Sequence, residues 1–108
     1  VSPVAGHRAG SGLVAYDASK AALSGVLRQA TREGMKREVR VNAVVPGLID
    51  TSLGRLATVM RPGRTSTLPF GRQGTSWEVA SATLFLLSDE AAYVAGHELF
   101  VDGGLRVL

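Results

Sequence analysis

Small and apolar positions in the first third of the chain recur at helical spacing. Between Ala15 and about Glu33 there is neither a proline nor a β-branched run, and Gly34 follows as the expected C-cap. The pattern therefore predicts a helix, entered from a proline- and glycine-containing loop over residues 3–14. The residues that define the spacing are Ala18, Ala21, Ala22, Val26 and Ala30.

Two short apolar runs end at turn residues and predict strands. Residues 39–45 read Val-Arg-Val-Asn-Ala-Val-Val and stop at Pro46-Gly47. Residues 98–101 read Glu-Leu-Phe-Val and stop at an Asp-Gly-Gly turn. Runs of this length, closed by glycine or proline, are typical of buried strands.

A second helix is predicted to begin near Thr75. Thr75 and Glu78 match a capping box, and the following residues are apolar nearly all round as far as Ser88. Such a helix is expected to be buried. The preceding residues 48–74 show no clear period and are interpreted as an irregular segment, suited to a lid.

The order of these elements indicates the fold class. Helix, strand, irregular segment, helix and strand alternate as in a parallel α/β sheet. With 108 residues the chain has room for one domain only. Two strands alone do not make a stable sheet, so we expect an upstream portion to supply further strands.

Composition narrows the class of protein. Apolar residues make up 45% and charged residues 19%, as in soluble globular chains, and no apolar stretch reaches the roughly 18 residues of a membrane span. The chain starts at Val1 without a signal sequence, so its start is interpreted as internal. It holds no cysteine, which excludes disulfides and fits a cytoplasmic origin.

The charge balance argues against a nucleic-acid-binding protein, and the positions of the histidines argue against a metal site. Twelve basic against nine acidic residues give a net charge of only +3, so a nucleic-acid partner is not expected. The one basic cluster, residues 32–40, falls where the first helix should end, and cations there complement the helix dipole. His7 and His97 lie far apart with no third ligand at metal spacing, so no metal site is expected.

Tyr16 and Lys20 are the candidate catalytic pair. Four residues apart, they share one face of the predicted helix. A carbonyl that receives hydride needs a proton on its oxygen, and a phenol serves poorly at neutral pH until a nearby ammonium favours its ionised form. On spacing alone, an ordinary aromatic and an ordinary cation on a helix surface is the simpler interpretation.

The surrounding sequence resembles the short-chain dehydrogenase/reductase family and reverses that judgement. Residues 16–23, Tyr-Asp-Ala-Ser-Lys-Ala-Ala-Leu, are similar to the active-site helix of the family. Residues 40–51 resemble its strand and Pro-Gly turn beside the nicotinamide. Further ordered matches over residues 71–89 and 96–104 are similar to its closing section, and the likeness is strongest to oxoacyl-carrier-protein-reductase-like members.

The resemblance implies a fold and a set of site residues. Residues 1–108 would be the C-terminal portion of one Rossmann-like, doubly wound parallel sheet. Tyr16 would donate and accept the proton, and Lys20 would hold the nicotinamide ribose and favour the ionised phenol. The residues expected to line the nicotinamide, with Ile49 backbone groups and the Thr51 hydroxyl meeting its carboxamide, are Pro46, Gly47, Ile49 and Thr51.

The N-terminal residues depart from the pattern of the family. The resemblance places a catalytic serine where this chain has Pro3, which offers neither a hydroxyl nor a backbone N–H. Ser2 is one residue away, and in a strand a shift of one residue turns the side chain to the opposite face. If the strand has already ended, a loop leaves Ser2 free to turn toward Tyr16, so Ser2 is the third catalytic candidate.

The implied activity is hydride transfer between NAD or NADP and a small-molecule ketone or alcohol. No Gly-x-x-x-Gly-x-Gly stretch follows a predicted strand in the chain, and the residue that selects NAD or NADP is missing. The missing N-terminal portion of the same enzyme is therefore an expected partner.

Small residues on the first helix also predict a homo-oligomer: Ala18, Ala21, Ala22, Ser24 and Gly25. The alternative is a catalytically incompetent, truncated family member that acts only as an oligomerisation or structural module.

Overall fold

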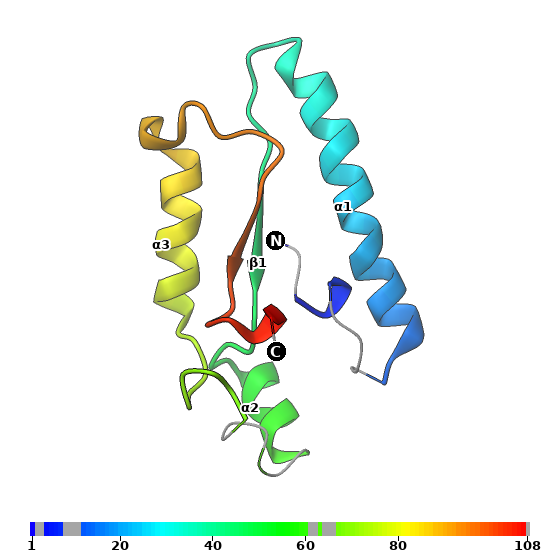
Figure 1. The fold of residues 1–108 in the computed structure, drawn as a ribbon, viewed down its shortest axis with the longest axis vertical. Helices are drawn as coiled ribbons and strands as arrows, with labels where there is room; N and C mark the ends of the chain where they lie inside the picture. Colours follow the sequence, from blue (N-terminus) through cyan, green and yellow to red (C-terminus); the bar gives the residue numbers. More distant parts are fainter. Residues whose placement is uncertain (2–3, 8–11, 61–62, 64–66, 108) are drawn as a thin grey trace.

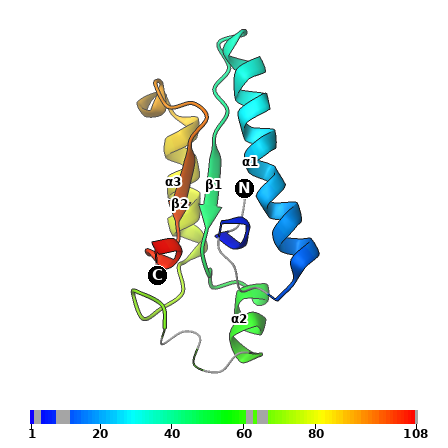
Figure 2. The ribbon, with the colours of Figure 1, turned by 45° about the vertical axis from the view of Figure 1, so that its right-hand side comes forward.

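The fold is a two-stranded parallel sheet with a long helix on each side (Figures 1 and 2). The structure is a computed structural model, and it describes residues 1, 4–7, 12–60, 63 and 67–107. In chain order the elements are η1 (Val4–Gly6), α1 (Val14–Met35), β1 (Ala43–Pro46), α2 (Ser52–Val59), α3 (Ser76–Leu87), η2 (Asp89–Ala91), β2 (Glu98–Val101) and η3 (Leu105–Val107).

The strand pair confirms the parallel α/β alternation expected from the sequence. β1 and β2 run parallel with Val44 opposite Leu99 and Val45 opposite Phe100. β2 has the predicted bounds, whereas β1 begins at Ala43 and not at residue 39.

The residues before β1 use their side chains to hold the connection between α3 and β2. The Arg40 guanidinium donates to the carbonyl oxygens of Leu86, at 2.8 Å, and Ser88, at 3.1 Å. The Asn42 amide donates to the Val94 carbonyl at 2.8 Å, and its oxygen accepts the His97 N–H at 3.0 Å. These bonds join residues 40–42 to the end of α3 and to the segment between α3 and β2, and the Gly96 N–H also donates to the Val41 carbonyl at 2.8 Å.

The two faces of the sheet pack against different parts of the chain. On the α3 side, Val44, Leu86 and Ala91 are buried. On the other side Val45 is fully buried, and η1 lies between the strands and α1 in both views (Figures 1 and 2). The partly buried residues that pack against the α3-side core are Val79, Val94, Leu99 and Val101.

The predicted C-cap of α1 is wrong. The helix continues through Gly34 to Met35, and the residue with a left-handed backbone is Glu38, at φ 58°. Gly34 is required for a different reason, since a Cβ there would lie 2.7 Å from the Val39 carbonyl oxygen. Position 34 therefore needs a glycine because residue 39 passes close to the end of the helix, and not because Gly34 caps the helix.

α3 confirms the predicted capping box but not the predicted burial. The Thr75 hydroxyl accepts the Glu78 N–H, and the Glu78 carboxylate accepts the Thr75 N–H. Leu86 is the one buried residue of the helix, whereas Trp77 is 80% exposed. Because a two-stranded sheet offers only a narrow apolar face, it cannot cover a helix that is apolar all round. No helix in the described part of the chain is long and apolar enough to cross a membrane.

Residues 48–74 are not wholly irregular, because they contain α2. Thr51 is its N-cap, and Gly54 is buried in its first turn. A Cβ at Gly54 would collide with the Ile49 carbonyl oxygen, so this helix needs a glycine inside it. Residues 61–62 and 64–66 lie outside the described residues, and a lid role for the segment stays a prediction.

Two glycines of α1 give a matched test of this packing. Gly34→Ala is expected to lower the free energy of unfolding by about 1–3 kcal/mol, because the new methyl group meets the Val39 carbonyl. Gly25→Ala is expected to raise it by about 0.5–1 kcal/mol, since helix propensity improves and the nearest atom, on Arg28, is 3.8 Å away. Urea denaturation measures both, and a stabilising Gly34→Ala would contradict the packing.

Candidate active site

The carboxyl ends of the two strands meet at one edge of the sheet. Pro46 pairs with Val101, and the next residue, Gly47, donates its N–H to the Val101 carbonyl at 3.1 Å. A Cβ at Gly47 would lie 2.7 Å from the Asp102 Cα, so only glycine permits this approach. In open parallel sheets ligands bind outside this edge.

Beyond Gly47 the chain presents an unused donor at Ile49. The Gly74 N–H donates to the Leu48 carbonyl at 3.0 Å, and the Asp50 N–H donates to the Gly74 carbonyl at 2.7 Å. The polar groups of Ile49 itself therefore face the other way. Its carbonyl accepts the Thr51 N–H at 2.9 Å, and its N–H has no hydrogen-bond partner among the described residues.

Thr51 adds a second donor beside Ile49. Its hydroxyl oxygen accepts the Gly54 N–H at 3.1 Å as the N-cap of α2. A hydroxyl that accepts one bond can still donate its own proton, and Thr51 is exposed. These two adjacent donors, without an acceptor among the described residues, suit a planar group with a carbonyl oxygen, such as a carboxamide.

Tyr16 and Lys20 are brought together in the first turns of α1. The Lys20 Nζ lies 5.4 Å from the centroid of the Tyr16 ring, within the range of a cation–π contact. Tyr16 is 40% exposed, so its phenol is accessible to a bound molecule. Over the described parts of the chain, no hydrogen bond or ion pair joins this pair to residues 46–51.

η1 packs directly on α1 beside the pair. A Cβ at Gly6 would lie 2.7 Å from the Lys20 carbonyl carbon, so the η1 backbone touches the helix backbone there. Ser2 and Pro3, which carry the question of the third catalytic residue, lie outside the described residues. The assignment of Ser2 stays a prediction.

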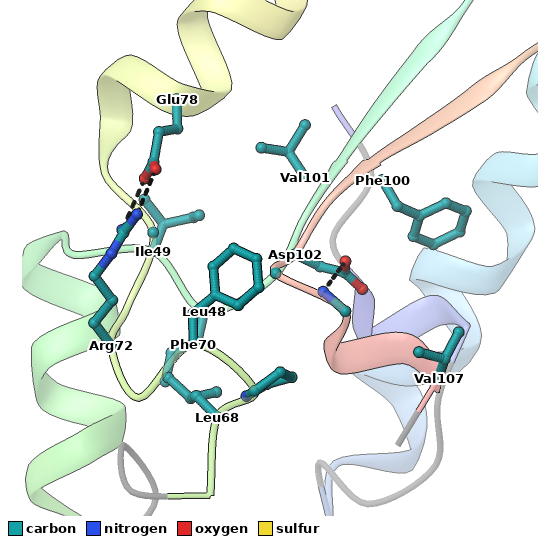
Figure 3. A pocket seen from close by; sticks show the side chains of 14 residues that line it. Leu48, Ile49, Leu68, Phe70, Arg72, Glu78, Phe100, Val101, Asp102 and Val107 are labelled. Carbon is teal, nitrogen blue, oxygen red and sulfur yellow. Dashed lines mark hydrogen bonds and ion pairs between the residues drawn. The ribbon is translucent and has the colours of Figure 1, made fainter.

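A cavity of about 530 Å³ opens at the same edge of the sheet (Figure 3). Ile49 is the one predicted site residue that lines it. Sequence reasoning missed the rest of its wall, because these side chains come from segments far apart in the chain. The labelled lining residues are Leu48, Ile49, Leu68, Phe70, Arg72, Glu78, Phe100, Val101, Asp102 and Val107.

An ion pair between Arg72 and Glu78 lies at the wall of this cavity. The guanidinium donates to both carboxylate oxygens, at 2.7 and 3.0 Å (Figure 3). The hydrogen bond from Arg72, followed by those from the Thr75 backbone and hydroxyl, lowers the pKa of Glu78 to about 2. The same contact raises the pKa of Arg72. Both side chains therefore stay charged at neutral pH.

No metal centre is found in the part of the chain that the structure describes. No three His, Asp or Glu side chains there are grouped closely enough to hold an ion. His7 instead packs edge-on against Phe100, with ring centroids 5.1 Å apart.

Comparisons with known proteins cover nearly the whole chain. A family profile described as enoyl-(acyl carrier protein) reductase matches residues 1–106. Carbonyl reductase family member 4 of Danio rerio is 43% identical over 108 residues, which are 100% of this chain and 44% of that protein. The 3-oxoacyl-[acyl-carrier-protein] reductase of Escherichia coli (strain K12) is 41% identical over 109 residues, 100% of this chain and 45% of that protein.

A solved structure from Beutenbergia cavernae, which carries NADP at low occupancy, matches with a TM-score of 0.90 and 34% identity. The match covers 99% of this chain and 44% of that one. The chain thus spans less than half the length of the relatives it matches.

The Glu78 contacts predict a pH-dependent stability. Because the pKa of Glu78 is lowered in the folded state, from 4.5 to about 2, its contribution is complete above pH 4.5 and lost as the pH falls toward 2. The thermal midpoint of Glu78→Gln should lie below that of the wild type at pH 7, and the gap should close between pH 4.5 and 2.

Glu90→Gln is the matched control, since Glu90 is exposed on η2 and makes no hydrogen bond or ion pair to the described residues. A gap for Glu78→Gln that is constant from pH 7 to pH 2 would contradict the assignment.

Proposed function

Because this chain belongs to the short-chain dehydrogenase/reductase family, we propose that the intact protein is an NAD(P)-dependent oxidoreductase that interconverts a ketone and an alcohol. Here the intact protein means this chain with whatever sequence flanks it in nature. The observation that carries the proposal is the pairing of Tyr16 with Lys20, whose Nζ lies 5.4 Å from the ring centroid. The two parallel strands are part of the Rossmann-like, doubly wound sheet of the family.

The chain's own groups fit a nicotinamide at the carboxyl edge of the sheet. The Ile49 N–H, which has no acceptor in the described part of the chain, and the Thr51 hydroxyl would donate to the carboxamide oxygen. Pro46 and Gly47 would lie along the ring, where the absence of a side chain at Gly47 leaves the two strand ends close together. When bound, the nicotinamide supplies or accepts the hydride.

Tyr16 would supply the proton to the carbonyl oxygen from its phenol, and would take it back in the oxidative direction. The Lys20 ammonium beside the ring would attract the negative charge that develops on the phenol oxygen as the proton leaves. Lys20 would also bind the nicotinamide ribose. The exposure of Tyr16 leaves room for a substrate against its hydroxyl.

We propose that the rest of the enzyme comes from the part of the relatives' length that this chain does not span, and that it lies upstream of this chain. This chain spans less than half of their length, and among the described residues no strand precedes the glycines at positions 6, 10 and 12, as a pyrophosphate-binding turn requires. We propose that the upstream region binds most of the dinucleotide and selects NAD or NADP. Reductases of oxoacyl and other carbonyl groups among the relatives support a ketone as the substrate class.

Self-association through α1 is a further part of the proposal. Ala18, Ala21 and Ala22 are exposed and would let a second helix approach closely. Ser24, predicted to share that surface, instead bonds to Glu98 of β2.

The catalytic roles are tested in the intact protein with NADH, NADPH and a panel of ketones. Tyr16→Phe should lower kcat by about 100-fold or more and leave the cofactor Kd nearly unchanged, because it removes only the hydroxyl that donates the proton. Lys20→Ala should weaken both kcat and cofactor binding. Tyr93→Phe is the control, since Tyr93 is fully exposed beyond η2. Activity of Tyr16→Phe within about tenfold of wild type, about 1.4 kcal/mol, would refute the assignment.

Ser2 is tested against Pro3 in the same assay. If the Ser2 hydroxyl bonds the substrate carbonyl, Ser2→Ala should lower kcat by about 10-fold or more, while Pro3→Ser changes it little. A silent Ser2→Ala, together with a Pro3→Ser that raises kcat about 100-fold, equal to about 2.7 kcal/mol, would show that Ser2 is a bystander.

A further inference from the structure

Glu98, on β2, is bonded to the helix that carries the candidate catalytic pair. The Ser24 hydroxyl donates to Glu98 Oε1 at 2.6 Å, across 74 positions of sequence. Among the described residues this is the one side-chain hydrogen bond between α1 and a strand. The Glu98 side chain is only 23% exposed, so solvent competes weakly for the bond.

The second carboxylate oxygen of Glu98 faces the segment after η1. His7 Nε2 lies 3.7 Å from Glu98 Oε2, and the His7 side chain is 16% exposed. His7 also packs edge-on against Phe100, whose ring is covered by the Arg106 guanidinium at 4.0 Å. Glu98 therefore stands between α1 and the segment that follows the candidate Ser2.

Helical geometry links the Ser24 bond to the catalytic pair. Tyr16, Lys20 and Ser24 are spaced by four residues each, so they follow one stripe along α1. The stripe continues to Leu27 and Thr31, which are buried on the side facing the sheet. The rotation of α1 about its axis thus decides whether Tyr16 and Lys20 face the carboxyl edge.

A small rotation is enough to matter. A side-chain atom about 6 Å from the helix axis moves about 1 Å when the helix turns by roughly ten degrees. A displacement of about 1 Å at a reacting group costs on the order of 100-fold in rate. A single short hydrogen bond on the same stripe, one turn beyond Lys20, is well placed to prevent it.

We propose that Glu98 is a positioning residue, which sets the rotation of α1 through Ser24 and so holds Tyr16 and Lys20 toward the substrate. The proposal rests on the proposed function. Glu98 and Ser24 themselves would not touch the substrate. Their hydrogen bond would orient the catalytic pair as well as stabilise the fold.

The experiment uses four variants of the intact protein. Glu98→Ala and Ser24→Ala remove the bond, whereas Glu98→Gln keeps an oxygen that accepts the Ser24 proton and Ser24→Thr keeps the hydroxyl. Glu98→Gln also removes the charge that faces His7, so it separates the two contacts of Glu98. Two exposed residues of the same types, whose side chains make no hydrogen bond or ion pair to the described residues, give the controls Glu90→Ala and Ser81→Ala.

Steady-state kinetics are compared at a temperature where circular dichroism shows every variant folded. Both bond-removing variants should lower kcat at least tenfold with KM for the ketone within about threefold, and the double variant should be no worse than either one. Glu98→Gln and Ser24→Thr should stay within threefold of wild type. If Ser24→Ala, the milder change, keeps kcat within threefold, or if Glu98→Gln falls as far as Glu98→Ala, the proposal is overturned.

A second readout does not depend on the reaction. The NMR signal of the Tyr16 ring, assigned by its loss in Tyr16→Phe, should shift in Glu98→Ala and Ser24→Ala and return to its wild-type position in Glu98→Gln. A ring signal unmoved in both alanine variants also overturns the proposal. If Tyr16→Phe stayed active, the proposed function would be refuted. The proposal for Glu98 could still be tested, because the ring signal of Tyr16 reports whether Glu98 sets the rotation of α1.

Discussion

The parallel pairing of β1 with β2 is the interaction on which the rest of the structure depends. Because both strands end at the same edge, the pairing brings Pro46-Gly47 against Asp102, although more than half the chain separates them in sequence. It also divides the side chains between two faces, with Val44 toward α3 and Val45 toward α1. A slip of one residue would exchange the faces and turn Glu98 away from α1.

Close backbone contacts fix how the helices join that sheet. At Gly34, Gly47 and Gly54 another stretch of backbone lies where a Cβ would stand. Each of these contacts fixes the distance between two stretches of backbone, which a movement of side chains cannot change. The Ser24–Glu98 bond joins two side chains, so it bears on the orientation of α1 instead. The proposed site thus combines a rigid edge, built from backbone, with a helix that side-chain hydrogen bonds from Ser24 and Thr31 join to the rest of the chain.

Local signals made part of this fold predictable. The bounds of β2 and the capping box at Thr75 follow from residues that are neighbours in sequence, and the structure confirms both. The role of Gly34 and the Ser24–Glu98 bond depend on which segments meet in space, which no local pattern contains. Burial of α3 was predicted from its own apolarity, but burial also needs a partner wide enough to cover it. For the site, spacing and resemblance identified Tyr16 and Lys20, and their roles remain predictions.

The exposure of α3 has a spectroscopic consequence. Trp77 is the only tryptophan of the chain, and it is 80% exposed next to Glu78. Intrinsic indole emission from this chain therefore comes from one solvent-facing ring in the first turn of α3, beside a carboxylate bonded to Arg72. Quenching of that emission by iodide or acrylamide reports whether another surface has covered α3, without a label and without any assay of turnover.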